Sequence, residues 1–183
     1  MDKGGAAYGR FLDGDNSGIE EIIADYKDTL ILYLVQFCGN LTAAEDLMED
    51  VFVKLVVDKP KFKQKSSFKT WLFAIAANTA KDYLRKSKRK SFVPIEDLEN
   101  VGAEEDLLSE HFKNEQKILI HKCMDKLNPE YKQVLYLSFF EDFSNAEIAG
   151  IMKKSTRQVE NLLYRAKQSL KSKMEEEGFN YEN

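Results

Sequence analysis

Apolar residues recur every three or four positions in several long segments of the chain, a spacing that predicts amphipathic helices. The first predicted helix spans about residues 19–37, and Gly39 followed by Asn40 supplies a stop at its C-terminal end. Its apolar positions are Ile22, Ile23, Tyr26, Leu30 and Leu34. The periodic part of the chain is therefore expected to begin with one long helix.

Two further helices are predicted before residue 91. Thr42 and Glu45 have the spacing of a capping box, which predicts a helix start there, and Pro60 marks the limit of that helix. Its apolar face comprises Leu47, Val51, Phe52 and Leu55. The next helix is predicted from Ser67 through about Arg89. Its apolar stripe comprises Trp71, Leu72, Ile75, Ala76, Thr79 and Tyr83.

Capping residues predict a helix-turn-helix in the C-terminal half. Asn128 precedes Pro129, and proline suits the first position of a helix. Two capping boxes then predict a helix of about two turns and a longer one; they are the pairs Ser144 with Glu147 and Ser155 with Gln158. The apolar positions of the longer helix are Val159, Leu162, Leu163, Ala166 and Leu170. A short helix, a tight turn and a longer helix with a polar outer face are typical of a DNA-reading helix-turn-helix.

The composition favours an all-helical protein. The chain has 183 residues, of which 43% are apolar, enough for the cores of one large domain or two small ones. Its 9 glycines and 3 prolines are far fewer than a sandwich or barrel with many tight turns requires. We therefore expect an all-α fold of two small helical domains joined by an acidic linker, the C-terminal one a helix-turn-helix.

Charge is sorted along the chain, although the formal net charge is only −4. Residues 19–58 carry nine acids and two lysines, whereas residues 59–90 carry eleven basic groups and one acid. Residues 91–115 hold eight acids and one lysine, and residues 153–173 hold seven basic groups and one acid. Any contact with nucleic acid is therefore expected to be local, on two basic surfaces separated by an acidic tether.

Several classes of site find no support in the sequence. Cys38 and Cys123 lie far apart without a C-x-x-C motif, and His111 and His121 have no ligand-like spacing to either, so we expect no metal site and no disulfide framework. The N-terminus lacks the apolar core of a signal peptide, and no stretch has the roughly 18 apolar residues of a spanning helix. We expect a cytoplasmic protein without membrane insertion.

Two stretches together resemble a known family. AEDLMEDVFVKL (residues 44–55) and FKTWLFAIAANTAKDYLRKSKRK (68–90) resemble the second region of sigma-70 family initiation factors. The segment 127–171, which begins LNPEYKQVLYLSFF, resembles their fourth region. The two regions occur in this order in a short chain and are joined by an acidic linker. This arrangement resembles the extracytoplasmic-function (ECF) group. This chain has Glu49 at a position where members of the group commonly have glutamine.

The resemblance implies an alternative sigma factor. Such a protein binds core RNA polymerase, recognises the minus-thirty-five and minus-ten promoter elements and promotes strand opening. Core RNA polymerase and promoter DNA are thus the expected partners, an inhibitory anti-sigma factor is left open, and no cofactor is expected. The expected domains are an N-terminal tail (1–18), a region 2 domain (19–90), the acidic linker (91–115), a region 4 domain (116–174) and a C-terminal tail (175–183).

Four acids near the start of the second predicted helix suggest a surface for polymerase. The helix dipole favours acids in the first turn and explains Glu45, but neighbouring carboxylates repel one another. We therefore predict that Asp46, Glu49 and Asp50 bind polymerase.

The basic segment 59–90 suggests a site for the opened minus-ten strand. Lysines alternate with Phe62 and Phe68, and cations can follow phosphates while aromatic or amide groups receive an unstacked base. The resemblance implies base contact by Asn78. The predicted minus-ten residues are Lys63, Lys65, Asn78, Lys81, Arg85 and Lys88.

The long helix of the helix-turn-helix is expected to read the minus-thirty-five element. Arginine pairs with guanine edges, and asparagine or glutamine pairs with adenine, although the capping role of Gln158 competes with base contact. The predicted residues are Thr156, Arg157, Gln158, Glu160, Asn161, Tyr164, Arg165 and Lys167.

Two other classes of function fit the sequence less well. A free-standing helix-turn-helix transcriptional regulator is the alternative, but it leaves the basic aromatic stretch 59–90 unexplained. A helical hydrolase needs converging carboxylates, and Glu45 and Asp46, as sequence neighbours, point about 100 degrees apart on a helix. With no P-loop and no catalytic residues identified, we expect no enzymatic activity.

Overall fold

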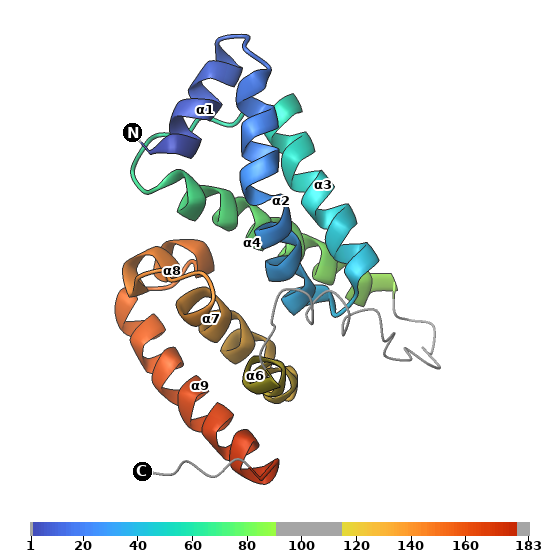
Figure 1. The fold of residues 1–183 in the computed structure, drawn as a ribbon, viewed down its shortest axis with the longest axis vertical. Helices are drawn as coiled ribbons and strands as arrows, with labels where there is room; N and C mark the ends of the chain where they lie inside the picture. Colours follow the sequence, from blue (N-terminus) through green and yellow to red (C-terminus); the bar gives the residue numbers. More distant parts are fainter. Residues whose placement is uncertain (1, 91–114, 179–183) are drawn as a thin grey trace. The chain divides into compact units, whose positions relative to one another are not determined.

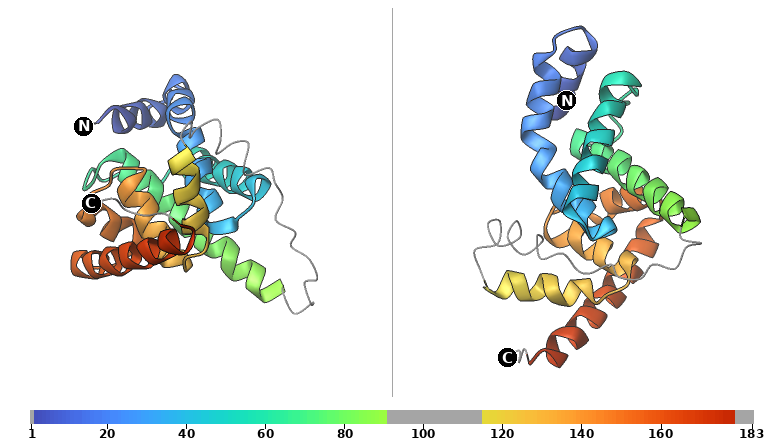
Figure 2. Two further views of the ribbon diagram at one scale, coloured as in Figure 1. Left: turned by 60° about the horizontal axis from the view of Figure 1, so that its bottom comes forward. Right: turned by 90° about the vertical axis from the view of Figure 1, so that its right-hand side faces the viewer.

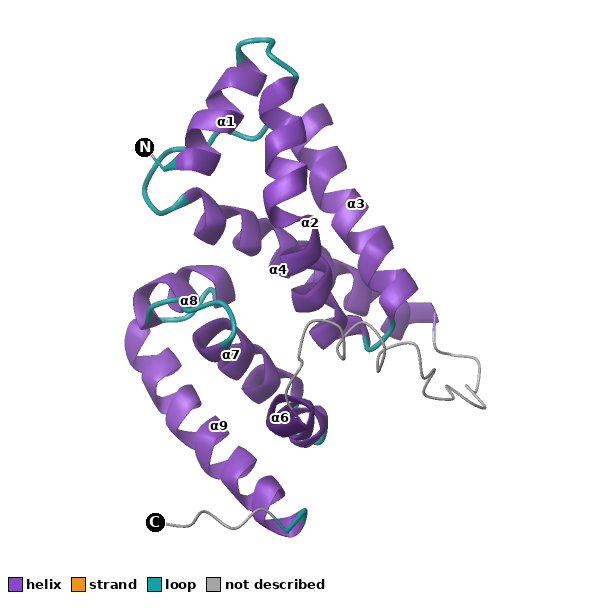
Figure 3. Cartoon of the chain, viewed as in Figure 1, coloured by secondary structure: helices purple, strands orange, loops and turns teal. Residues whose placement is uncertain are grey.

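Eight helices and no strand make up the part of the chain that the computed structural model describes, residues 2–90 and 115–178 (Figures 1 and 3). The chain divides into two compact units, one chiefly of residues before Glu99 and the other chiefly of residues after it. The predicted all-α, two-domain fold class is confirmed. The predicted acidic linker, 91–115, lies outside the described residues except for its last residue.

Four helices form the first unit: α1 (Lys3–Leu12), α2 (Ser17–Cys38), α3 (Leu41–Val57) and α4 (Phe68–Lys90). The long helix α2 contacts each of the other three, and Figure 1 and the right-hand view of Figure 2 show it beside α3. The core is rich in large apolar and aromatic side chains. Those almost fully buried include Tyr8, Ile22, Leu30, Tyr33, Leu34, Leu55, Phe68, Leu72 and Phe73.

The turn between α2 and α3 confirms one predicted signal and corrects another. Gly39 ends α2 in the left-handed conformation (φ 61°), as predicted. The side-chain oxygen of Asn40 then accepts a hydrogen bond from the Ala43 N–H at 2.9 Å and caps α3. The capping box predicted at Thr42 is therefore wrong. Asn40 has the extended backbone that an N-cap needs and is intrinsically the better cap, so the helix begins at Leu41.

The N-terminal segment is the largest departure from the prediction. Residues 3–12 do not form a tail, because Ala7, Tyr8 and Phe11 are buried between α1 and the rest of the unit. Gly18 of α2 allows the helices to approach closely, since a Cβ there would collide with the Ala7 carbonyl oxygen. Ala7 and Phe11 have a helical spacing and Asp2 caps the helix start, but the three glycines of KGGAAYGRFL lower its helix propensity, and this helix was not predicted.

The buried face of α4 is wider than the predicted stripe. Leu72, Ala76 and Thr79 are buried as expected, but Phe73, Ala77 and Ala80 are buried too. The reason is that α4 packs against α1, α2 and α3, so more than one of its faces is covered. Tyr83, which was predicted to lie on the stripe, is 37% exposed.

The second unit contains α6 (Glu115–Asp125), α7 (Pro129–Phe139), α8 (Asn145–Met152) and α9 (Thr156–Glu176). Asn128 caps α7 by accepting from the Tyr131 N–H at 2.9 Å, and Pro129 occupies the first turn, as predicted. Helix α9 packs on α6 and α7. Its buried residues are Val159, Leu163, Ala166 and Met174; Leu162 and Leu170, predicted to be buried, are half-buried.

The corrected cap of α3 gives a stability prediction. Asn40→Ala should lower the free energy of unfolding by about 0.5–2 kcal/mol, because the Ala43 N–H loses its acceptor. Thr42→Ala should change it by less than about 0.5 kcal/mol, because the Thr42 side chain is exposed. Chemical denaturation followed by circular dichroism measures both. A loss for Thr42→Ala as large as that for Asn40→Ala would contradict the assigned cap.

Candidate functional site

One exposed face of α3 carries acids that are not needed for the fold. Asp46, Glu49 and Asp50 are all exposed, and their spacing of three and four residues places them on one side of the helix. Among the described residues they form no salt bridge or hydrogen bond. The buried side of α3, with Ala44, Leu47, Val51 and Leu55, faces the core. The structure therefore brings the three predicted polymerase-binding residues together on a free surface.

The same face continues into exposed valines that the sequence reasoning missed. Val53 is 55% exposed and Val57 is 71% exposed, and they follow Asp46 by seven and eleven residues. Val56 is 40% exposed beside them. A usable signal was present, because residues 51–57 contain more apolar side chains than one helix face can bury. We call Asp46, Glu49, Asp50, Val53 and Val57 the α3 outer face.

Between α3 and α4, the basic loop (residues 59–67) exposes four lysines. Lys59, Lys61, Lys63 and Lys65 are exposed, whereas Phe62 turns inward and is half-buried. The Phe62 ring lies 5.6 Å from that of Phe68 and 5.2 Å from that of Trp71, measured between ring centroids. The loop thus presents cations outward from an aromatic anchor.

The second half of α4 carries further exposed cations. Lys81 and Arg85 are exposed, and the Arg85 guanidinium pairs with Asp82 at 3.1 Å. Asn78 is half-buried and makes no hydrogen bond within the described residues. The spacing of residues 78, 81 and 85 places these three predicted minus-ten residues on neighbouring turns of one side. The side chain of Lys88 is outside the described residues.

The turn from α8 into α9 has the predicted caps. The Ser155 side chain accepts from the Gln158 N–H at 3.2 Å, and the Gln158 side chain accepts from the Ser155 N–H at 2.8 Å. Ser144 and Glu147 make the equivalent pair at the start of α8. Gln158 is therefore occupied by its capping role, as expected, although its side chain is exposed.

The outer side of α9 presents every predicted minus-thirty-five residue to solvent. Thr156, Arg157, Gln158, Glu160, Asn161, Tyr164, Arg165 and Lys167 are all exposed. Lys167 has its ammonium 5.1 Å from the centroid of the exposed Phe139 ring, which holds it close to the end of α7.

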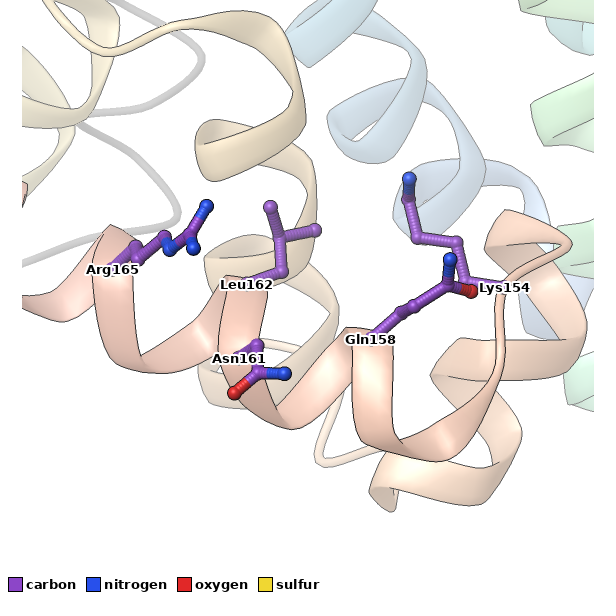
Figure 4. Close-up of a pocket in the computed structure, with 5 residues that line it drawn as sticks. All are labelled: Lys154, Gln158, Asn161, Leu162 and Arg165. Atoms are coloured by element: carbon purple, nitrogen blue, oxygen red, sulfur yellow. The ribbon is translucent and has the colours of Figure 1, made fainter.

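A hollow runs along one side of α9 (Figure 4). It is lined by Lys154, Gln158, Asn161, Leu162 and Arg165. The Lys154 ammonium also pairs with Glu130 of α7 at 2.9 Å. The structure thus gathers Gln158, Asn161 and Arg165 at the hollow, while Arg157 and Tyr164 lie outside its lining. Amide and guanidinium groups, which can each pair with a base edge, therefore lie along this side of α9.

Other sites receive little support within the described ranges. These residues contain no group of three or more side chains that could hold a metal ion, and no helix in them has the length and apolar character needed to cross a bilayer. Within these ranges Cys38 and Cys123 form no disulfide. Burial lowers the pKa of His121 to about 4, so its ring is neutral at physiological pH and packs against Phe140.

Both units of the chain match known protein families. A family model for sigma-70 region 2 matches residues 22–90, and one for sigma-70 region 4 matches residues 117–170. The chain is 31% identical to the RNA polymerase sigma factor YlaC of Bacillus subtilis over 161 residues, 85% of this chain and 91% of YlaC. It is 26% identical over 176 residues to the ECF sigma factor SigW of the same organism, covering 88% of this chain and 91% of SigW.

The chain belongs to the ECF group of sigma-70 family sigma factors. It is an alternative sigma factor, which binds core RNA polymerase, recognises the minus-thirty-five and minus-ten promoter elements and promotes strand opening. The region 2 match accounts for the basic aromatic stretch, which the free-standing regulator leaves unexplained.

The fold of this sigma factor is shared with a solved structure from Bartonella quintana. That structure holds the sigma factor RpoE in complex with the anti-sigma factor NepR. The TM-score is 0.69 at 20% identity, and the match covers 85% of this chain and 96% of RpoE. The region 2 match begins at Ile22, so α1 lies entirely before it.

Proposed function

We propose that this sigma factor binds core RNA polymerase through the α3 outer face. The observation that carries the proposal is the combination of three unpaired acids and two exposed valines on one side of a helix. Protein interfaces combine an apolar centre with charged groups at the rim, and the charges steer association. Val53 and Val57 would supply the apolar contact, and Asp46, Glu49 and Asp50 would meet a basic partner.

The basic loop and α4 would hold the opened minus-ten strand. Lys63, Lys65, Lys81, Arg85 and Lys88 supply cations for phosphates, and Asn78 supplies an amide for a base edge. The half-buried, unpaired state of Asn78 supports this role, because an amide partly removed from water gains more from a new hydrogen bond.

Helix α9 would read the minus-thirty-five element. Arg157, Asn161 and Arg165 have side chains able to reach base edges, and Glu160 can accept from cytosine. Gln158 would act mainly by fixing the start of the helix. The remaining residues, Thr156, Tyr164 and Lys167, would help to position the helix on the DNA backbone.

The factor itself would carry out no catalysis. Promoter opening would use binding energy, while polymerase makes RNA, and the protein would act in the cytoplasm with the polymerase. The RpoE structure contains an anti-sigma factor. By analogy, we infer that an inhibitory protein could hold this chain away from polymerase, and its valine-bearing α3 face is an apolar surface that such a protein could cover.

Reversing charge on the α3 outer face tests the polymerase contact. Asp46→Lys with Asp50→Lys should weaken holoenzyme assembly at least about tenfold, because two attractive charges become repulsive. The measurement is titration of core polymerase with labelled sigma factor. The matched control, Glu20→Lys with Asp28→Lys, changes two exposed acids of α2 by the same charge and should bind normally. Normal assembly by the α3 variant would refute the proposed surface.

Asn78→Ala tests the minus-ten strand site. Loss of one base contact of this kind should cost about 1–3 kcal/mol of discrimination at one position. Permanganate footprints of the holoenzyme on promoters with single substitutions in the minus-ten element would measure it. Unchanged opening and unchanged base preference would exclude Asn78 from the site.

Two variants of α9 separate base reading from phosphate contact. Arg157→Ala should relax preference at one or two base pairs of the minus-thirty-five element. Lys171→Ala, near the far end of α9, should weaken binding to all promoter sequences alike and lower the salt dependence of binding. Selection of promoter DNA by each holoenzyme provides the comparison. Identical preferences for wild type and Arg157→Ala would remove Arg157 from direct readout.

A further inference from the structure

The basic loop needs support from outside itself. Its lysines repel one another, and Lys59 and Gln64 adopt positive φ angles of 43° and 55°. These angles are unfavourable for residues with a Cβ, so contacts from elsewhere must hold the loop. Several of the contacts that hold it come from α1, the helix that lies before the residues matching region 2.

Tyr8 and Phe11 of α1 hold the first half of the loop. The Tyr8 hydroxyl donates a hydrogen bond to the Pro60 carbonyl oxygen at 3.0 Å. The Lys59 ammonium lies 5.2 Å from the centroid of the Phe11 ring. The Tyr8 ring also lies 5.3 Å from the Trp71 ring, and Trp71 in turn packs against Phe62 of the loop. One face of α1 thus contacts the loop backbone and one of its lysines directly, and its aromatic anchor Phe62 through Trp71.

Asp2 fixes the point where the loop enters α4. One oxygen of its carboxylate accepts from the Gly5 N–H of α1 at 2.8 Å, and the other accepts from the Phe68 N–H, the first residue of α4, at 2.6 Å. A single negative charge therefore serves the N-terminal ends of two helices, where the helix dipole favours it. The two helix starts are held together by one side chain.

Gly4 allows this close approach. A Cβ at this position would lie 2.5 Å from the Phe68 ring and 2.9 Å from the Tyr26 hydroxyl oxygen. Gly9, five residues further along the same helix, has nothing within 4 Å of the corresponding position. The glycine at position 4 is thus required by contact with α4, whereas that at position 9 is not.

We propose that α1 is a positioning element for promoter opening: through Asp2, Gly4 and Tyr8 it holds the basic loop and the start of α4 in the conformation that receives the minus-ten strand. The inference rests on the proposed role of the loop in binding that strand. A preformed loop avoids the entropy cost of ordering four lysines when DNA binds. None of these three residues lies on the α3 outer face, so α1 should affect opening and leave polymerase assembly unchanged.

Matched variants of the whole 183-residue chain test this inference. Asp2→Asn has a single acceptor oxygen in place of two, Gly4→Ala pushes α1 away from Phe68, and Tyr8→Phe removes the bond to Pro60 while keeping the ring. Asp13→Asn and Gly9→Ala are the controls for charge and for helix substitution in the same segment. Core-polymerase affinity, permanganate reactivity of the minus-ten element in the holoenzyme, and fluorescence of Trp71, the single tryptophan of the chain, are measured for each.

The three test variants should reduce opening by about three- to tenfold, with polymerase affinity within about twofold of wild type. Acrylamide should quench Trp71 more readily in the free variants, because the contacts around its ring loosen. Both controls should behave as wild type. If Gly4→Ala or Asp2→Asn does not fold by circular dichroism, Tyr8→Phe decides, since it loses one hydrogen bond only.

The inference would be overturned if variants with altered Trp71 quenching still opened the promoter at the wild-type level. It would also be overturned if the variants lost polymerase assembly and promoter opening to the same extent. Lys63→Ala with Lys65→Ala distinguishes this failure from failure of the proposed loop function. If the lysine variant opens promoters poorly and the α1 variants open them normally, only the role of α1 is wrong. If the lysine variant also opens promoters normally, the loop itself is misassigned and the inference falls with it.

Discussion

The first unit depends on the burial of α2. Its residues 30–35 are all buried, so this part of the helix has no polar side and must be covered all around. Helices α1, α3 and α4 each contact α2 and turn apolar faces towards it. The outer faces of these three helices do not take part in the core. The acids of α3 and the cations of α4 occupy those outer faces, so the packing that makes the fold also separates the two proposed interfaces.

The separation of charge has a physical benefit for a protein with two unlike partners. A charged surface attracts partners of the opposite sign and repels partners of the same sign. The acids on α3 and the cations on the basic loop and α4 would therefore keep the proposed polymerase and DNA contacts distinct. Lys54 illustrates how the structure preserves this division. It lies on α3, but its ammonium donates to the Thr79 hydroxyl at 2.8 Å and is drawn towards α4, away from the acidic side of its own helix.

Much of this arrangement could be predicted from the sequence because it depends on local signals. The periods of α2, α3 and α9, the stop at Gly39 and the capping box at Ser155 are all properties of short segments. The missed features depend on contacts between segments. Residues 3–12 have a local helix cap in Asp2, but the docking of this helix depends on the bond from Phe68 to Asp2 and on the close contacts at Gly4 and Gly18. No local pattern reports those contacts. The exposure of Val53 and Val57 likewise depends on which side of α3 meets the core.

The capping box of α9 has a consequence for how this factor could change. The hydrogen bonds between Ser155 and Gln158 fix where the helix starts, while Thr156, Arg157, Glu160 and Asn161 add little buried area to the unit. Exposed positions of this kind tolerate substitution at a cost of about 0.5 kcal/mol or less. With the proposed role of α9 in reading the minus-thirty-five element, new promoter preferences can arise by exchange of these side chains without loss of folding. A duplicated copy of the gene could acquire a separate set of target promoters in a few mutational steps.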